Sequence, residues 1–323
     1  MLGALWDAET APGLRTLEAV EVLRQVWVQQ FWVEDGTVRW RTEDDLPPAS
    51  QRIRSPYDPQ VRVSSKRSQV WTGYKVQVTE SCDEDLPHLV TAVQTTAATL
   101  PDVVALPLVR ADLAAKDLLP AEQFVDAAYV SAEQLVRSNA QGIDLVGPAS
   151  QAPTRAKEGY TQEHFTLDWS TRTATCPQGA HAAAWKTNYD RHGARVVRVE
   201  FAGTDCRACP VRSACIDGTR YARTLCVRPE AEFRALHAAR VRQQTEEFQQ
   251  RYRRRAGIEG TISQAVRAYD LRHARYFGLA KTQVQHVLIA VALNLARLAA
   301  WFDGRTRAHT RVSPFASLFQ PAA

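Results

Sequence analysis

YRRRAGIE, residues 252–259, is the most informative stretch of this chain. Tyr252, Arg255 and Glu259 follow one another at intervals of three and four residues. On a helix this spacing places the three side chains on one face, so a carboxylate and a guanidinium point to the same place. A carboxylate can hold a divalent cation and an arginine can grip phosphate, a combination that suits phosphoryl chemistry. The alternative is an ordinary ion pair between Arg255 and Glu259 on an exposed helix.

The Tyr-x2-Arg-x3-Glu spacing resembles the signature of a large group of bacterial insertion-sequence transposases of the DDE type. The following sequence is also similar to that family, above all RHARYFGLAK at residues 272–281. One departure is Val266, which stands where the family usually has a lysine seven residues after the glutamate. The resemblance implies an RNase H-like fold in which Glu259 is the third acidic residue of the metal site and Tyr252 and Arg255 belong to the same catalytic unit.

A second motif, FVDAAY at residues 124–129, resembles the family's second acidic position. Asp126 follows a predicted buried strand, and Ala128 stands where the family usually has glycine. Taken alone, such an aspartate more often ends a strand or caps a turn. Its position ahead of Tyr252 and Glu259, in the family's order, favours the catalytic role.

The resemblance implies a site for Mg²⁺ or Mn²⁺ held by Asp126 and Glu259. Two such ions about 4 Å apart clamp the attacking and leaving oxygens of a phosphodiester. Hard cations need several oxygen ligands, so we expect three carboxylates. The family's first aspartate lies on a strand upstream of the helix predicted at 16–30, in an Asp-Ser-Thr-like setting, and no Asp-Ser-Thr occurs in the sequence. We therefore expect a chain that lacks the segment with the first ligand; Asp7 and Asp58 are the alternatives, and we interpret Asp58 as a loop residue.

The order of elements predicts an α/β protein, because strands alternate with helices and helices close the chain. With the resemblance, this indicates an RNase H-like mixed sheet with flanking helices, its first strand missing, and a Cys-rich β insertion. We divide the chain into five segments: a helix and hairpin at 1–42, the first part of the core at 43–149, the Cys-rich insertion at 150–228, helices that complete the core at 229–304, and a basic tail at 305–323.

Local patterns predict the individual elements. Residues 16–30 have the apolar spacing of a helix, and FWVEDGTVRW is a hairpin that turns at Asp35-Gly36. We expect a loop at 43–69, strands at 71–81 and 88–96, a helix at 101–115, a strand at 123–130, a helix capped by Ser131, and a short strand at 143–147. Residues 281–302 are apolar nearly all round, which predicts a buried core helix.

Four cysteines form a separate candidate site. Cys206 and Cys209 have the Cys-x2-Cys spacing, Cys215 follows, and Cys176 lies in a Cys-Pro-Gln-Gly turn upstream. Four thiolates suit a structural Zn²⁺, which would stabilise a small β insertion without a large core. Buried thiols without metal are the alternative. We interpret Cys82 and Cys226 as packed thiols.

The densest basic patch is the candidate DNA surface. It comprises Arg251, Arg253, Arg254, Arg267, Arg272, Arg275 and Lys281. A solvated helix face is the alternative. Three aromatic residues could stack on bases of opened DNA or belong to the core: Trp71, Trp185 and Tyr160.

Composition bounds the remaining possibilities. The formal net charge is +5, and only six of the 40 basic residues are lysine, a bias that suits a polyanion or reflects a GC-rich genome. The apolar runs are shorter than a membrane span and no secretory signal is evident, so we expect a cytoplasmic protein.

Three functions compete. The first is a transposase that cleaves and joins double-stranded DNA at transposon ends. The second is a catalytically inactive DNA-binding remnant. The third is a zinc-stabilised α/β protein without catalysis. If the first strand is missing, the unpaired sheet edges should favour a homodimer or poor solubility.

Overall fold

The computed structural model describes residues 12–66, 68–152, 159–216 and 222–305. The chain divides into two compact units: Met1–Leu119 with Arg255–Ala323, called unit 1, and Pro120–Arg254, called unit 2. The five segments expected from the sequence do not follow these units. Short 3-10 turns occur at η1 (Pro12–Thr16), η2 (Glu43–Asp45), η3 (Ala127–Tyr129), η4 (Gln162–His164) and η5 (Arg253–Arg255).

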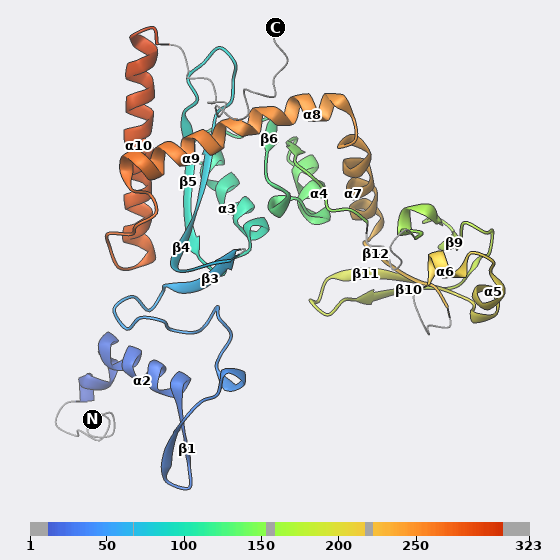
Figure 1. Ribbon diagram of the computed structural model, residues 1–323, viewed down its shortest axis with the longest axis horizontal. Coiled ribbons are helices and arrows are strands. Elements are labelled where there is room, and N and C mark those ends of the chain that lie inside the picture. The colour runs from blue at the N-terminus through green and yellow to red at the C-terminus, as the bar shows by residue number, and fades with distance from the viewer. Residues whose placement is uncertain (1–11, 67, 153–158, 217–221, 306–323) are drawn as a thin grey trace, which may run out of the picture. The chain divides into compact units, whose positions relative to one another are not determined.

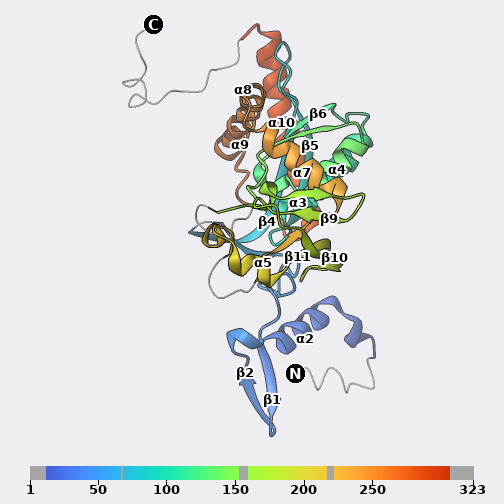
Figure 2. The ribbon, with the colours of Figure 1, turned by 90° about the vertical axis from the view of Figure 1, so that its right-hand side faces the viewer.

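Unit 1 begins with the predicted helix and hairpin. Helix α2 (Glu18–Gln30) leads into the antiparallel pair β1 (Phe31–Glu34) and β2 (Thr37–Trp40), visible in Figure 2. Asp35 and Gly36 both have positive φ, 49° and 74°, as a two-residue hairpin turn requires. The ring of Phe31 lies 4.6 Å from Trp27 and 4.2 Å from Trp40, between centroids, which ties the helix to the hairpin.

The central sheet of unit 1 contains β3 (Arg62–Lys66), β4 (Gln69–Glu80) and β5 (Val90–Ala97) in antiparallel order β3-β4-β5 (Figure 1). Strand β3 lies where we expected a loop. Its sequence, RVSSK, has little apolar content, so its backbone pairing with β4 was not visible in the hydrophobic pattern. A register shift pairs Thr79 with Ala92 and Glu80 with Val90, so Thr91 is a bulge.

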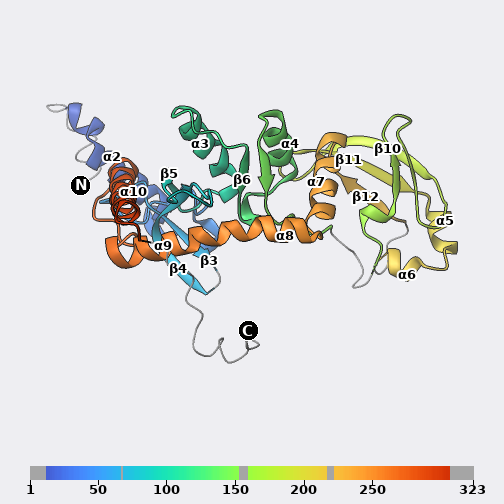
Figure 3. The ribbon, with the colours of Figure 1, turned by 90° about the horizontal axis from the view of Figure 1, so that it is seen from above.

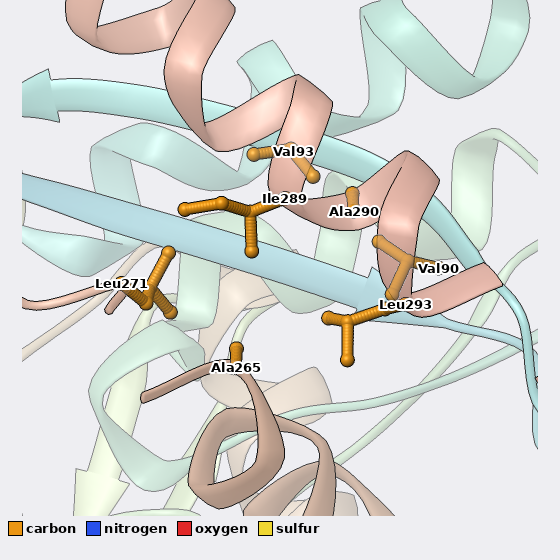
Figure 4. Packing of buried hydrophobic residues seen from close by; sticks show 7 residues of the cluster. All are labelled: Val90, Val93, Ala265, Leu271, Ile289, Ala290 and Leu293. Atoms are coloured by element: carbon orange, nitrogen blue, oxygen red, sulfur yellow. The ribbon is translucent and has the colours of Figure 1, made fainter. Parts of the chain in front are cut away.

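This bulge decides which residues of β5 face each helix layer. Ala92 packs with Val109 and Leu113 of α3 (Asp102–Ala114). Val90 and Val93 instead join the core formed with α9 (Ala256–Tyr269) and α10 (Leu279–Phe302). Figure 4 shows this second cluster, which is completed by Ala265, Leu271, Ile289, Ala290 and Leu293.

Side-chain amides of α10 cover backbone groups of β5. Asn294 bonds to both the N–H and the carbonyl of Val90, at 2.8 and 2.9 Å. Gln283 accepts from the N–H of Thr95 at 2.6 Å and donates to the carbonyl of Val93 at 2.8 Å. These bonds replace those that a further strand would make, so the unpaired edge that we expected is satisfied at these positions.

The composition of α10 led us to expect a helix buried on all sides, and this prediction was wrong. Its inner face packs on the sheet, whereas an apolar outer stripe is exposed and comprises Val284, Val287, Leu288, Val291, Leu295 and Phe302. The sequence predicted apolar runs too short to span a membrane. By length and composition, however, α10 could cross one, and it is the one such helix in the described part of the chain. Its amide bonds to β5 are those of a helix packed on a sheet.

Unit 2 starts with a parallel pair, β6 (Glu122–Phe124) and β7 (Asp144–Val146). Helix α4 (Ala132–Ala140) connects them, and the Ser131 side chain caps it by accepting from the N–H of Gln134 at 3.1 Å, as predicted. Helix α7 (Glu230–Arg242) lies beside α4 (Figure 3), and α8 (Glu246–Tyr252) follows it. The strand predicted at 123–130 is therefore shorter and ends before Asp126.

The Cys-rich part of unit 2 is built from β8 (Thr166–Asp168), β9 (Thr173–Thr175), β10 (Ala182–Tyr189), β11 (Arg195–Phe201) and β12 (Thr224–Val227), with short helices α5 (Gly203–Ala208) and α6 (Arg212–Cys215). Strands β10, β11 and β12 form an antiparallel sheet around a core that includes Val199, Phe201 and Val227.

The mixed α/β class is confirmed. Within the described residues the strands form separate sheets of two or three strands, antiparallel except for β6 and β7. The single RNase H-like sheet stays a prediction, because β3–β5 belong to unit 1 and β6–β7 to unit 2.

Candidate functional site

Asp126 lies directly after the parallel pair of unit 2. The N–H of Val125 donates to the carbonyl of Val146 at 2.9 Å and extends the strand pairing up to this point. Asp126 is half-buried, with extended backbone, and its side chain does not cap the following turn η3. Ala128 sits in that turn without the positive φ that would require glycine. An acidic residue is thus fixed at the carboxyl end of a strand.

Tyr252 lies next to this strand end. Its hydroxyl donates to the carbonyl of Val125 at 3.1 Å, across 127 residues of sequence. Its ring stacks on Phe248, one turn earlier on α8, with centroids 5.6 Å apart. The two motifs singled out in the sequence therefore meet within unit 2.

Gly147 allows the close approach of β7 to this strand end. A Cβ atom at residue 147 would lie 2.7 Å from the carbonyl oxygen of Val125, nearer than atoms can approach. That oxygen also receives the Tyr252 hydrogen bond. Backbone packing at Gly147 and the Tyr252 hydroxyl together position the residue before Asp126.

An ion-pair network attaches α8 to β6 and β7. Arg251 bonds to Glu122, and its guanidinium lies 3.0 Å from an oxygen of Asp144. Arg242 bonds the other Asp144 oxygen at 2.6 Å. Burial raises the pKa of Asp144, but hydrogen bonds and charge from the two arginines outweigh it and lower that pKa.

This network gives Arg251 a structural role. Arg254, with 3.7 Å between its guanidinium and Glu122, belongs to the same group. Both residues were predicted to contact DNA; Arg251 is half-buried in this ion-pair network, whereas Arg254 is exposed and keeps that prediction open. Arg253 is exposed.

The spacing of Tyr252, Arg255 and Glu259 predicted a single helix, but the structure divides this signature between two. Helix α8 ends at Tyr252, residues Arg253–Arg255 form the 3-10 turn η5, and α9 begins at Ala256. Gly257 and Gly260 in the first turns of α9 lower helix propensity there. The boundary between the units also falls here, between Arg254 and Arg255.

Glu259 and Arg255 belong to unit 1. Their side chains form the predicted i, i+4 ion pair, with 3.1 Å between Arg255 Nη2 and Glu259 Oε1. The Glu259 side chain is 63% exposed, so its carboxylate is open to a ligand from solvent. Because the Glu259 end of the pair faces solvent, water screens the interaction and its contribution to stability is small.

The opposite face of α9 is held by Glu80, a residue that the sequence motifs did not single out. The Glu80 side chain is only 6% exposed and accepts hydrogen bonds from Thr261 and, at 3.0 Å, from Arg297. The alternating pattern of β4 offered a signal, because Glu80 shares a strand face with Val76 and Val78. This buried ion pair fixes the helix that carries Glu259.

Asp58 is a structural residue of unit 1. It is buried, and its two oxygens accept from the Tyr74 hydroxyl at 2.7 and 2.8 Å. One of them also accepts from the N–H of Gly278 at 2.9 Å. Burial and the Asp58 carboxylate raise the pKa of Tyr74. With its oxygens engaged, Asp58 is unsuited to replace the first metal ligand, and Asp7 lies outside the described residues.

The carboxylates predicted to hold Mg²⁺ are divided between the units, with Asp126 in unit 2 and Glu259 in unit 1. Across the part of the chain that the structure describes, no group of three or more His, Cys, Asp or Glu side chains is close enough to hold a metal ion. Asp126 and Glu259 each offer carboxylate oxygens of the kind that Mg²⁺ prefers.

The four predicted zinc ligands lie in the same part of unit 2. Burial raises the pKa of the Cys215 thiol, Arg223 lowers it, and the charges of Cys206, Cys209 and Cys176 raise it further. As placed, they do not meet the distances of a metal group. Cys176, Cys206 and Cys215 pack against the same core of unit 2, which favours a common site.

Two backbone contacts support this cysteine cluster. The N–H of Arg223 points to Cys206 Sγ at 3.4 Å, and the Arg223 guanidinium donates to the Cys215 carbonyl at 2.7 Å. The other two cysteines differ from our expectation in part: Cys82 is half-buried, but Cys226 is exposed rather than packed.

The remaining candidates for DNA contact are clearer. Four basic residues of unit 1 are exposed: Arg267, Arg272, Arg275 and Lys281. Trp185 instead belongs to the core of unit 2, where its ring meets Trp169 edge-on at 5.2 Å. Tyr160 packs against the same core, and Trp71 is half-buried on β4.

Residues 175–299 match the family model described as a transposase DDE domain. This range includes the four cysteines of the cluster together with Tyr252, Arg255 and Glu259, whereas Asp126 lies outside it. No curated protein and no solved structure matches this chain. The match supports a DDE transposase.

Proposed function

We propose that this chain is the catalytic portion of a DDE-type transposase that cleaves DNA strands at transposon ends and joins them to a target. The match over residues 175–299 supports the transposase class. The observation that carries the catalytic assignment is the hydrogen bond from Tyr252 to the carbonyl of Val125. It brings the tyrosine of the transposase-like signature beside Asp126, the residue that resembles the family's second acidic position.

In this proposal Asp126 and Glu259 hold Mg²⁺ or Mn²⁺. Their carboxylates fit a hard cation, which would supply activation of the attacking oxygen and stabilisation of the leaving one. Arg255 orients the exposed Glu259 carboxylate through the 3.1 Å ion pair and can turn to a phosphate oxygen. Tyr252 acts on Asp126 indirectly, as a positioning residue for the strand end.

Double-stranded DNA is the proposed substrate, and the cytoplasm the proposed location. The exposed cations proposed to contact its backbone are Arg253, Arg254, Arg267, Arg272, Arg275 and Lys281. Such contacts position DNA without reading its sequence, and binding should weaken as salt is raised.

The test is Mn²⁺ binding by calorimetry on the full chain and on Asp126→Asn and Glu259→Gln. Loss of binding in both variants is expected if the two carboxylates share one site. The matched control is Glu247→Gln, whose carboxylate on α8 is 80% exposed and belongs to no proposed site. Binding that survives both substitutions would refute the assignment.

Strand cleavage on labelled duplex DNA separates an active enzyme from an inactive one. Mn²⁺-dependent nicking that disappears in Asp126→Asn is the expected result. The inactive DNA-binding protein is identified instead if wild type binds DNA without nicking it and if Asp126→Asn and Glu259→Gln leave Mn²⁺ binding unchanged.

We also propose that Cys176, Cys206, Cys209 and Cys215 bind a structural Zn²⁺. Their soft thiolates fit this ion, and zinc would hold α5 and α6 against the small sheet of unit 2. One equivalent of zinc by elemental analysis is expected, reduced in Cys206→Ser. Cys226→Ser, an exposed cysteine on β12, is the matched control and should retain the metal. Zinc-free protein purified without chelators would contradict the proposal.

A further inference from the structure

Three exposed aromatic side chains of unit 1 lie on two loops that the fold brings together. Tyr57 is 78% exposed, Phe277 67% and Tyr276 54%. The rings of Tyr57 and Phe277 are stacked, with centroids 6.4 Å apart and an interplanar angle of 27°. They come from two loops more than two hundred residues apart in sequence, so the fold itself brings them together.

Hydrogen bonds fix the backbone beneath these rings. The buried Asp58 carboxylate binds the N–H of Gly278, and the Gln60 side chain accepts from the N–H of Leu279 at 2.8 Å. Gln285 accepts from the N–H of Arg275 and donates to the carbonyl of His273, both at 2.8 Å. Exposed aromatic groups on loops held in this way are suited to bind a ligand, because little backbone entropy is lost on binding.

The charge around the rings is positive. Arg54 precedes Tyr57, and Arg272, Arg275 and Lys281 flank Tyr276 and Phe277, all of them exposed. The acidic residues nearest to the rings in sequence are already engaged, Asp58 with Tyr74 and Asp270 with His273 at 2.5 Å. A ligand that combines flat unsaturated rings with negative charge therefore fits this surface.

We propose that Tyr57, Tyr276 and Phe277 form a stacking platform for unpaired nucleobases of DNA, with Arg272, Arg275 and Lys281 on the adjoining phosphates. Aromatic side chains stack on every type of base, so the platform should tolerate sequence changes. The inference rests on the proposed function, since cleavage at a transposon end exposes unpaired nucleotides. Forked-DNA binding that neither Tyr57→Ala nor Phe277→Ala weakens would overturn this assignment and leave a protein partner as the occupant of the rings.

The test compares binding of a blunt DNA duplex with binding of a forked duplex of the same sequence, with 2-aminopurine at an unpaired position. Wild type should bind the forked DNA more tightly and change the fluorescence of the probe. Tyr57→Ala and Phe277→Ala should each weaken forked-DNA binding about 5- to 150-fold, the range expected for one lost base stack. Binding of the blunt duplex should stay within about twofold, because phosphate contacts are kept.

Two controls distinguish stacking from a general effect. Tyr57→Phe keeps the ring and should retain forked-DNA binding. Tyr189→Ala removes a tyrosine of unit 2 that is 69% exposed, and should leave both affinities unchanged. Equal losses on forked and blunt DNA, or no loss on either, would overturn the platform, as would an unchanged probe signal.

The outcome is independent of catalysis. Platform-dependent binding by a protein that never nicks DNA would support the platform and refute the proposed enzyme. Nicking that depends on Asp126, with no effect of Tyr57→Ala or Phe277→Ala on forked-DNA binding, would support the enzyme and refute the platform.

Discussion

Arg297→Met tests how the fold holds α9, the helix that carries Glu259. The Arg297 guanidinium, on a side chain 18% exposed, donates to Glu80 at 3.0 Å and to the carbonyl of His88 at 2.6 Å. Methionine keeps much of the volume but leaves the Glu80 carboxylate, 6% exposed, without its counter-charge. Removing one partner of a buried ion pair costs about 3–5 kcal/mol, so we expect a loss of this size in the free energy of unfolding.

The double variant Arg297→Met with Glu80→Gln separates the charge from the packing. It removes the stranded carboxylate, and replacing both members of a buried pair is often close to neutral. We therefore expect the double variant to be more stable than Arg297→Met alone. Urea unfolding followed by circular dichroism measures both losses, and hydrogen exchange of residues 256–269 shows whether α9 is the segment that loosens.

The reasoning fails if Arg297→Met costs less than about 1 kcal/mol, the value of an exposed pair. Glu80→Gln alone completes the cycle, and the reasoning also fails if the double variant loses at least the sum of the losses of Arg297→Met and Glu80→Gln, because the partners would then be uncoupled. Arg137→Met provides the control. Its ion pair with Glu133 on α4 has both side chains 59% exposed, and its removal should leave the unfolding midpoint unchanged.

Three further changes have defined outcomes. Gly147→Ala should lower stability by about 1–3 kcal/mol, measured by thermal unfolding, because its Cβ would meet the Val125 carbonyl at 2.7 Å; unchanged stability would contradict the packing. Burial lowers the pKa of His286, so on acidification the unfolded chain takes up a proton at about pH 6.5 and the folded chain does so at a lower pH. The contribution of neutral His286 to the free energy of unfolding should be complete above that pH and should decline as pH falls toward the folded pKa. Urea midpoints measured from pH 7.5 to about 5 should show this decline in wild type and a flatter profile in His286→Gln. If a homodimer forms, the exposed stripe of α10 is its expected surface, so wild type should associate with rising concentration in sedimentation and Leu288→Glu with Leu295→Glu should not.

Local signals predicted much of the secondary structure. The Asp35-Gly36 turn requires positive φ at both residues, and few residue pairs adopt it so readily. Ser131 followed by an amphipathic segment predicted a capped helix because the hydroxyl satisfies an N–H that the helix leaves open. These features depend on neighbouring residues only, which is why one sequence is sufficient to find them.

Features that depend on distant partners were missed or misjudged. Strand β3 forms through pairing with β4, and its own residues carry no apolar alternation. The outer face of α10 is apolar and exposed, although its composition predicted burial. The apolar pattern of a helix does not show which elements pack against it, so this exposure could not be predicted. Glu80 and Asp58 have the chemistry of ligands but serve as anchors, a distinction that only their partners Arg297 and Tyr74 reveal.

The transposase-like signature illustrates the same limit at the candidate site. Its spacing predicted one helical face, yet Tyr252 ends α8 in unit 2 and Glu259 lies on α9 in unit 1, with a 3-10 turn between them. Tyr252 holds the strand end before Asp126, whereas Arg255 pairs with Glu259, so each residue acts within its own unit. The spacing therefore sets the length of chain between Tyr252 at the end of unit 2 and Glu259 near the start of α9 in unit 1. If Asp126 and Glu259 share one ion, as we propose, inserting one residue between Arg253 and Arg254 should weaken Mn²⁺ binding in calorimetry even though every side chain is retained, and unchanged binding would contradict the shared site.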